Sequence, residues 1–254
     1  MKIRIDKALV DKGLIPSRER AAALIMEGKV FVAGLPVSKA GSMVDSNAAI
    51  EVRGEDIPYV SRGGLKLEAA VKEFHIELEG RTAMDVGAST GGFTDCMLQK
   101  GARKVYCIDV GYGQLAWKLR QDSRVVLMER KNIRHMEREQ IPDVIDLAVI
   151  DVSFISLAKV VPRVLEFLKP EGELVALIKP QFEVGKGEVG KGGIVRDEGK
   201  RQAAVERVKE ELESLGLETL GIITSPILGQ KGNVEYLIYM RRGKAPAARE
   251  PEKV

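Results

Sequence analysis

The chain has 254 residues, of which 30% are charged and 44% hydrophobic, and its formal net charge at pH 7 is +3. This length allows one large or two modest domains, and a charge so near balance does not by itself indicate a nucleic-acid partner. The only cysteines and histidines, Cys96, Cys107, His75 and His135, lack the spacing of zinc ligands or of a Ser/His/Asp triad, so we expect no metal site and two reduced core cysteines.

The first six residues carry charges where a secretory signal would be apolar. No uninterrupted apolar run approaches the length of a membrane span. We therefore expect a cytoplasmic protein that does not act at a membrane.

Residues 1–57 predict a small α+β module. Residues 4–14 follow a helical pattern that stops at Gly13, and a second helix is expected over residues 18–27, ending at Gly28. Short strands at 30–32 and 50–52, with a turn at 33–36, complete a unit near the lower size limit for independent folding.

This module is locally basic, because residues 1–40 contain eight lysines and arginines against four acids. Such charge suits RNA phosphates, although a solvated helical face explains it equally well. The runs RIDKAL (4–9), SRERA (17–21) and GKVFV (28–32) resemble the αL RNA-binding motif of small-subunit ribosomal protein four and tyrosyl-tRNA synthetases. The resemblance implies RNA binding through Arg4, Lys7, Arg18, Arg20 and Lys29.

Residues 58–61 are expected to form a linker, since Pro58 interrupts regular structure. A helix over 63–75 follows, capped by Ser61. Its apolar positions, among them Leu67 and Val71, recur at helical spacing, and Lys66 lies at the flank of that stripe.

From residue 82 onward, apolar strands alternate with helical patterns, which predicts a mostly parallel sheet covered on both faces. The expected strands are 83–86, 104–109, 125–128, 145–151, 173–179, 219–224 and 234–240, and the expected helices are 92–100, 114–119, 155–168 and 197–215. The last two strands follow one another directly, which indicates one antiparallel partner. Residues 62–243 would form this domain, and 244–254 a disordered tail.

The stretch from Asp85 to Asp95 ends a strand, contains three glycines and then opens a helix. Glycines at such a turn allow positive φ and close approach of a ligand to the backbone. The spacing Gly-x-x-x-Gly-Gly differs from the dinucleotide fingerprint G-x-G-x-x-G. This difference argues against a nicotinamide or flavin cofactor as the ligand.

Three expected strands end in aspartate, at Asp85, Asp109 and Asp151. Parallel sheets bind ligands beyond these ends, and crowded carboxylates would repel a pyrophosphate but suit a cationic donor such as S-adenosyl-L-methionine. Aspartate is also common at turns, which is the alternative for each residue singly. Residues 185–192 match part of a P-loop but have Gly192 where a Ser or Thr is required, so they are either a substrate-contacting loop or a plain one.

Lys179 ends an apolar run, which would deliver its ammonium to the cleft at the strand ends. Partial burial and a second lysine nearby, Lys66, would favour a neutral amine that can act as a base. The alternative is a lysine that reaches solvent at a strand end.

Five stretches resemble the FtsJ-like ribose methyltransferases, and the whole arrangement resembles the TlyA family of rRNA 2′-O-methyltransferases, also called hemolysins. They are SRGGLKL (61–67), DVGASTGGFT (85–94), DVGYGQL (109–115), DVSFISL (151–157) and IKPQFE (178–183). The resemblance implies an α/β protein in which the RNA-binding module precedes a Rossmann-like class I methyltransferase domain with a mostly parallel seven-stranded sheet.

The resemblance further implies a catalytic tetrad of Lys66, Asp151, Lys179 and Glu235, with Lys179 as the base. It implies that S-adenosyl-L-methionine binds at Asp85, Gly87, Ala88, Ser89, Thr90, Gly91, Gly92, Phe93, Asp109, Val110, Asn132, Ile133 and Asp151. The expected substrate is a cytidine in ribosomal RNA or in ribosomal subunits, the expected state is a monomer, and no DNA partner is expected. Two other functions stay open: a non-catalytic RNA-binding or ribosome-assembly factor, and a membrane-active hemolysin.

Overall fold

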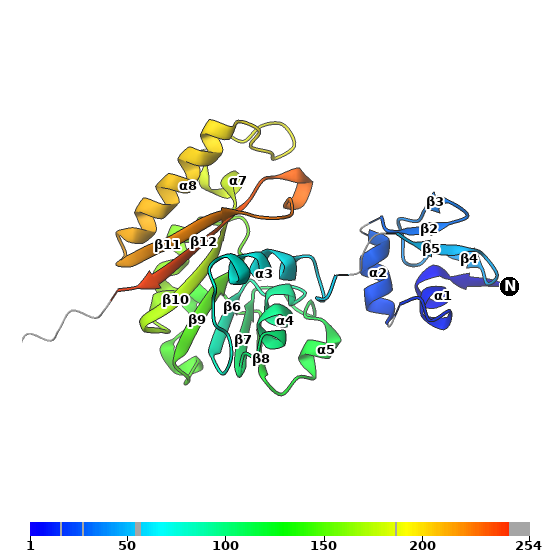
Figure 1. Cartoon of the computed structure of the whole chain (residues 1–254), viewed down its shortest axis with the longest axis horizontal. Helices are drawn as coiled ribbons and strands as arrows, with labels where there is room; N and C mark the ends of the chain where they lie inside the picture. Colours follow the sequence, from blue (N-terminus) through cyan, green and yellow to red (C-terminus); the bar gives the residue numbers. More distant parts are fainter. Residues whose placement is uncertain (16, 27, 54–56, 186, 244–254) are drawn as a thin grey trace, which may run out of the picture. The chain divides into compact units, whose positions relative to one another are not determined.

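A computed structural model describes residues 1–15, 17–26, 28–53, 57–185 and 187–243, and the expected tail at 244–254 lies outside them. The chain divides into two compact units, Met1–Ser61 and Arg62–Val254, each of which is described by itself (Figure 1). None of the described helices is both long and apolar enough to cross a membrane.

The amino-terminal unit packs two helices against short antiparallel strands. Its elements are β1 (Lys2–Arg4), α1 (Ile5–Asp11), α2 (Arg18–Met26), β2 (Val30–Val32), β3 (Leu35–Pro36), β4 (Met43–Asp45) and β5 (Ile50–Val52). The sheet order is β3-β2-β5, and β1 pairs separately with β4. Ile5, Leu9, Leu24, Ile25 and Val30 form a core without solvent exposure. The β1–β4 ladder was not predicted, because three-residue strands are too short to show an alternating pattern.

The larger unit contains a central sheet with helices on both faces. Its elements are α3 (Gly63–Glu73), β6 (Thr82–Val86), α4 (Gly92–Gln99), β7 (Lys104–Asp109), α5 (Trp117–Arg120), β8 (Val125–Glu129), η1 (Ile133–His135), η2 (Arg138–Gln140), β9 (Ile145–Ile150), η3 (Leu157–Lys159), α6 (Val161–Leu165), β10 (Leu168–Ile178), α7 (Pro180–Glu183), α8 (Glu198–Glu213), β11 (Leu217–Thr224), η4 (Gln230–Gly232) and β12 (Tyr236–Arg242).

The seven strands follow the order β11-β12-β10-β9-β6-β7-β8. Strands β10, β9, β6, β7 and β8 pair in parallel, whereas β12 runs antiparallel to both β10 and β11. The predicted mostly parallel seven-stranded sheet with one antiparallel late strand is therefore confirmed. Successive side chains of each strand point to opposite faces of the sheet. One face packs on α6 and α8, while α3 and α4 lie on the other (Figure 1).

Three local predictions were wrong. The helix expected over 114–119 begins only at Trp117, and the helix expected over 155–168 is divided into η3 and α6. Leu168 already pairs with Ile145 in the sheet, so the chain leaves the helix earlier than its apolar pattern suggests. Ser61 does not cap α3, because Arg62 is the residue at the N-cap and makes no side-chain cap.

Candidate active site

The carboxyl ends of β6, β9 and β10 meet the start of β12 at one edge of the sheet. The Asp151 backbone N–H donates to the Val86 carbonyl at 2.9 Å, directly beyond β6 and β9. Ile178 pairs with Tyr236 in the antiparallel register, which places Lys179 opposite Glu235 when the register is continued by one residue. Three of the four predicted tetrad residues therefore lie at adjoining strand ends.

Lys179 forms an ion pair with Asp151 at this edge. The Lys179 Nζ lies 2.6 Å from Asp151 Oδ1 and donates a hydrogen bond of 2.9 Å to Ser153 Oγ. The lysine side chain is only 10% exposed, so its ammonium does not extend into open water as an ordinary strand-end lysine would. Ser153 was not predicted as a site residue, although it stands two positions after the strand-end aspartate.

Lys66 and Glu235 form a second and deeper ion pair. Lys66 Nζ lies 2.6 Å from Glu235 Oε2, and the two side chains are 11% and 3% exposed. Helix α3 supplies the lysine, and the segment before β12 supplies the glutamate. A Cβ added to Gly229 would overlap the Glu235 carboxylate, so glycine is required where the preceding loop crosses this acid. Because burying charges costs free energy, each partner depends on the other.

Asn233, two residues before Glu235, joins its own loop to residues 193–195. Its Nδ2 donates to the Gly193 carbonyl at 2.9 Å, and its Oδ1 accepts from the Val195 backbone N–H at 3.2 Å. This buried amide fixes the end of the glycine-rich segment that was predicted either to contact substrate or to be a plain loop. Lys186 of that segment lies outside the described residues.

The glycine-rich turn closes around the strand-end acid Asp109. The Ser89 backbone N–H donates to Asp109 Oδ2 at 2.7 Å, and the Gly111 N–H donates to Oδ1 at 2.6 Å. Gly87 and Gly91 have φ values of 88° and 94°, as expected where the chain needs the left-handed region. A Cβ at Gly87 would overlap the Asp151 carbonyl oxygen, which brings this turn against the residue that pairs with Lys179.

The remaining predicted cofactor residues differ in exposure. Ala88, Gly91, Gly92, Phe93 and Ile133 are buried, Asn132 is half-buried, and Ser89, Thr90 and Val110 are exposed. Asn132 caps η1 by accepting a hydrogen bond of 3.2 Å from the Arg134 backbone N–H. Their contacts with a cofactor stay predictions.

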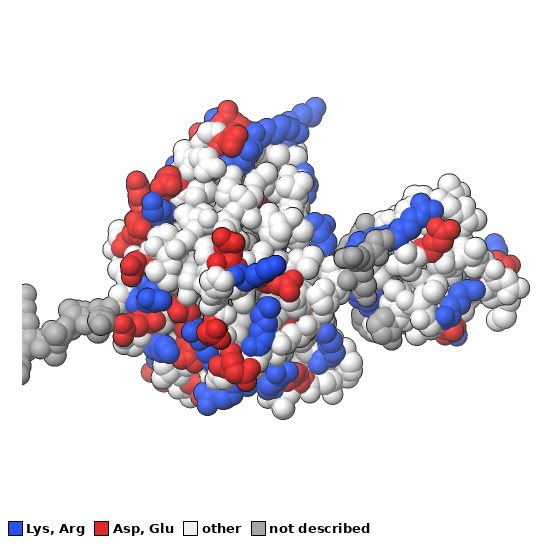
Figure 2. All heavy atoms as spheres, in the orientation of Figure 1, with Lys and Arg blue, Asp and Glu red and all other residues white. Residues whose placement is uncertain are grey.

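In the amino-terminal unit, two of the predicted RNA-binding residues share one acid. Arg4 and Arg18 both form ion pairs with Asp6, at 2.9 and 2.8 Å. Lys7 is exposed, and basic side chains lie on the face of this unit that Figure 2 shows. Asp6 was not predicted as a site residue, and its position between Arg4 and Lys7 was the only signal for it.

Comparison with known families agrees with this arrangement. A model of the FtsJ-like methyltransferase family matches residues 59–242. The chain belongs to the FtsJ-like methyltransferase family. An S4 domain model matches residues 3–50 of the amino-terminal unit, in agreement with the predicted RNA-binding motif.

Several relatives of this FtsJ-like methyltransferase align over nearly the whole chain. The 16S/23S rRNA (cytidine-2′-O)-methyltransferase TlyA of Mycobacterium tuberculosis is 46% identical over 94% of this chain and 90% of its own length. Hemolysin A of Brachyspira hyodysenteriae is 42% identical over 93% of this chain and 99% of its own length. A solved structure from Streptococcus thermophilus, described as a hemolysin, is 41% identical and covers 99% of this chain and 92% of its own, with a TM-score of 0.77.

An exposed aromatic side chain stands beside the ion pair of this FtsJ-like methyltransferase. Phe154 is 88% exposed, has a φ of 63°, and lies 4.9 Å from the Phe182 ring centroid to centroid. Phe182 in turn lies 6.0 Å from Lys179 Nζ. An exposed phenylalanine at a left-handed backbone position is uncommon, which makes this ring a candidate for contact with a ligand. Phe154 lies within a quoted motif but was not predicted as a site residue.

Asp85, predicted to bind the cofactor, lies inside the fold beneath the turn. It has no solvent exposure, and its Oδ2 accepts a hydrogen bond of 2.6 Å from Thr94 Oγ1. The pKa of Asp85 is raised from 3.8 to about 7, chiefly by burial; the Thr94 hydroxyl opposes the shift, and the carboxylates of Asp151 and Asp109 add to it. This acid therefore holds its proton far more readily than an exposed aspartate.

We expect the Asp85→Asn variant to gain stability relative to wild type as pH rises from about 4 to about 7. In that range the unfolded chain has released the Asp85 proton and the folded chain still holds it, so rising pH favours unfolding of wild type, by at most about 1.4 kcal/mol per pH unit. Asparagine cannot titrate and removes this dependence. Denaturant unfolding at several pH values, followed by fluorescence of Trp117, the chain's single tryptophan, measures the difference. The exposed Glu218→Gln is the control, and parallel pH curves for Asp85→Asn and wild type would contradict the expectation.

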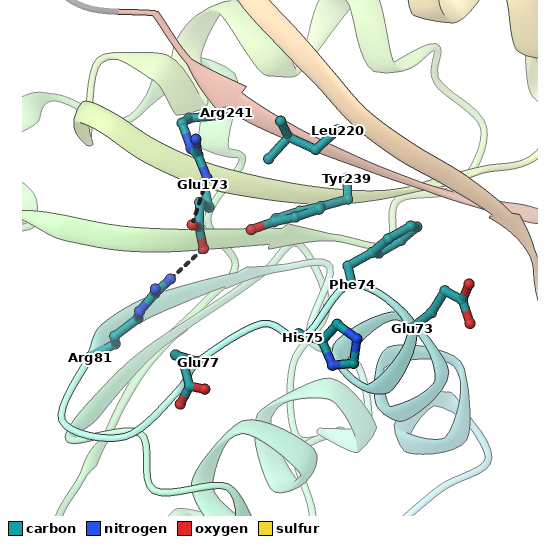
Figure 3. A pocket seen from close by; sticks show the side chains of 9 residues that line it. All are labelled: Glu73, Phe74, His75, Glu77, Arg81, Glu173, Leu220, Tyr239 and Arg241. Carbon is teal, nitrogen blue, oxygen red and sulfur yellow. Dashed lines mark hydrogen bonds and ion pairs between the residues drawn. The ribbon is translucent and has the colours of Figure 1, made fainter.

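A separate cleft of about 520 Å³ lies beside the middle of strand β10 (Figure 3). Glu173 stands within it, paired with Arg81 and, at 3.8 Å, with Arg241. Burial, followed by the adjacent Glu173 carboxylate, raises the pKa of Tyr239 to about 12. Both arginines of the cleft are therefore paired with Glu173, which lies five residues before the end of β10. The cleft is thus separate from Lys179, and we place the candidate active site at the carboxyl edge of the sheet.

Proposed function

We propose that this chain transfers the methyl group of S-adenosyl-L-methionine to the ribose 2′-hydroxyl of a cytidine in ribosomal RNA. The observation that carries the proposal is the meeting of two buried Lys–carboxylate pairs, Lys179–Asp151 and Lys66–Glu235, with the glycine-rich turn at one sheet edge. The relative from Mycobacterium tuberculosis, 46% identical, is named for this reaction on 16S and 23S rRNA.

The residues at the turn fit such a cofactor. Gly87 leaves room against the Asp151 carbonyl, and the carboxylates of Asp109 and Asp151 suit a ligand with a cationic centre. When bound, S-adenosyl-L-methionine supplies a methyl group on a positively charged sulfur. Ala88 to Phe93 would hold its amino-acid end, and Asn132 and Ile133 would contact its adenine.

In this mechanism Lys179 accepts the proton of the ribose 2′-hydroxyl at Nζ while the hydroxyl oxygen takes the methyl group. The bond from that carbon to the cofactor sulfur would break, and the cofactor would leave as the neutral thioether S-adenosylhomocysteine. Asp151 and Ser153 orient the amine through the contacts of 2.6 and 2.9 Å. Lys66 and Glu235 hold the ribose and Lys179 in register from the neighbouring strand end.

The amino-terminal unit is proposed to bring the substrate to this site. Its S4 domain match and the cations Arg4, Lys7, Arg18, Arg20 and Lys29 suit the backbone of structured RNA, which is recognised largely through shape and phosphates. The partner would be ribosomal RNA or a ribosomal subunit, met by a monomeric enzyme in the cytoplasm.

The exposed ring of Phe154 is proposed to stack on the target base. We expect Phe154→Ala to raise the KM for RNA, or lower kcat/KM, by about 5- to 100-fold, since stacking contributes about 1–3 kcal/mol per base. Cofactor affinity should stay unchanged, because the ring lies beyond the strand-end acids. Steady-state methylation with varied RNA measures this. Val144→Ala, another exposed apolar side chain, directly before β9, is the control, and wild-type kinetics of Phe154→Ala would contradict the role.

The direct test incubates the full chain with methyl-labelled S-adenosyl-L-methionine and with separated 30S and 50S subunits. Nuclease digestion and mass spectrometry should find the label in 2′-O-methylcytidine. Label on a base, or no label in any RNA although the cofactor binds, would overturn the proposal. The second outcome would instead favour a non-catalytic RNA-binding factor.

A further inference from the structure

Asp6 is a buried acid in the amino-terminal unit, close to two of the proposed RNA-binding arginines. It belongs to the first turn of α1 and is 4% exposed. Its Oδ1 accepts hydrogen bonds from Arg4 Nε at 3.0 Å and from the Lys7 backbone N–H at 2.9 Å. Its Oδ2 accepts from Arg4 Nη2 at 2.9 Å and from Arg18 Nη2 at 2.8 Å. One carboxylate therefore gathers two guanidinium groups, one from the end of β1 and one from the start of α2.

The two arginines remain half exposed although they share this acid. The exposed fractions of the Arg4 and Arg18 side chains are 51% and 53%. Asp6 uses Nε and Nη2 of each guanidinium, so the Nη1 groups are not among its donors. The Arg4 guanidinium also lies near Gly41. A Cβ at that glycine would lie 3.7 Å from Arg4 Nη1 and 3.8 Å from its Cζ and Nη2.

The charge of Asp6 is secure at physiological pH. Hydrogen bonding by Arg4 holds the pKa of Asp6 well below its usual range, with further lowering by Arg18 and the Lys7 N–H, while burial opposes the shift. Two guanidinium groups brought to one oxygen atom without an anion would repel each other. A permanent anion between them allows both to be held still while they face solvent.

We propose that Asp6 is a positioning residue that fixes Arg4 and Arg18 as a preorganised pair for adjacent phosphates of the RNA backbone. This inference rests on the proposed RNA-binding function of the amino-terminal unit. Fixing the two long side chains before binding reduces the conformational entropy lost on association. The remaining donors of two guanidinium groups held at one point suit phosphate oxygens, which guanidinium groups bind well.

The test compares two variants that change net charge equally. Asp6→Asn and Asp11→Asn each remove one negative charge from α1, and Asp11 is exposed. Charge alone predicts that both variants bind RNA more tightly. Positioning predicts that Asp6→Asn binds at least about 10-fold more weakly and that the slope of log K against log salt falls by about 1, the value of one phosphate contact. Asp11→Asn should bind as tightly as wild type or more tightly.

The measurement is affinity of the full chain for a ribosomal RNA fragment at several salt concentrations. Hydrogen exchange of peptides from residues 1–61 reports whether that unit stays folded. If Asp6→Asn unfolds it, Asp6→Glu replaces it in the comparison, because glutamate keeps the charge but displaces the carboxylate by one methylene. The Asp6→Glu variant should then bind the RNA fragment more weakly than wild type while residues 1–61 stay folded.

A double variant separates the failure of this inference from failure of the underlying function. Arg4→Ala/Arg18→Ala should weaken binding, and adding Asp6→Asn to it should cause no further loss. Wild-type affinity of the arginine double variant would overturn the RNA-binding assignment together with the inference. Loss in the arginine double variant, combined with wild-type affinity and salt slope of folded Asp6→Asn or Asp6→Glu, would overturn the positioning role alone.

Discussion

Replacement of Lys179 by alanine is expected to lower the rate of methyl transfer by about 10²- to 10⁴-fold, the usual contribution of general-base catalysis. The variant loses the only proposed acceptor of the ribose proton, while the turn around Asp109 keeps its own hydrogen bonds to Ser89 and Gly111. Cofactor affinity should therefore change by no more than about threefold, since one ion-pair partner of Asp151 is removed without disturbing the turn. Single-turnover methylation of subunits and calorimetric titration of S-adenosyl-L-methionine measure the two quantities separately.

Two further variants define what the lysine contributes. Lys179→Arg keeps a cation beside Asp151 but, because a guanidinium does not deprotonate in proteins, should be nearly as inactive as alanine. Lys159→Ala removes an exposed lysine of η3 and should methylate normally. If Lys179→Ala retained the wild-type rate with cofactor bound, the proton acceptor would have to be another group, and the proposed mechanism would fail.

Replacement of Lys66 by methionine is expected to reduce the free energy of unfolding by about 3–5 kcal/mol, because it leaves the Glu235 carboxylate buried without its cation. Activity should also fall steeply, since Glu235 lies opposite Lys179 at the strand ends. Denaturant unfolding and methylation assays at a temperature where the variant is folded measure these effects. Lys72→Met, an exposed lysine on the same helix, is the matched control.

The double variant Lys66→Met/Glu235→Gln distinguishes stability from catalysis. It removes both charges, so most of the lost stability should return, as is usual when a buried pair is replaced by neutral groups. Activity should stay low if the pair positions ribose and Lys179. Recovery of both stability and activity in the double variant would contradict a functional role for the pair.

Much of the fold could be predicted because its signals are local. Strand ends such as Asp109, and the glycines at 87 and 91, are readable from alternation and from the need for positive φ. The helix over 155–168 could not be read correctly, because an apolar run continues from helix into strand and only pairing of Leu168 with Ile145 ends the helix. The same limit hid the three-residue ladder between β1 and β4.

The candidate site divides in the same way. The residue types at the strand ends, together with the motifs around them, were enough to nominate Lys66, Asp151, Lys179 and Glu235. The contact between Lys66 and Glu235 was not readable, because the two residues are 169 positions apart. The contact of the Phe154 ring with Phe182 and the bridging amide of Asn233 likewise depend on loops that meet only in the folded chain.

The sequence by itself determined a small α+β module followed by a mostly parallel sheet with a ligand-binding turn, because periodicity, glycine spacing and strand-end acids are properties of short segments. The resemblance of its motifs to known families indicated that the module binds RNA and that the sheet belongs to a methyltransferase. The tertiary structure alone decided that Asp85 is a buried, proton-holding carboxyl and that Asp6 gathers two arginines. Burial and charge pairing are set by neighbours from distant segments, and no local pattern records which neighbours those are.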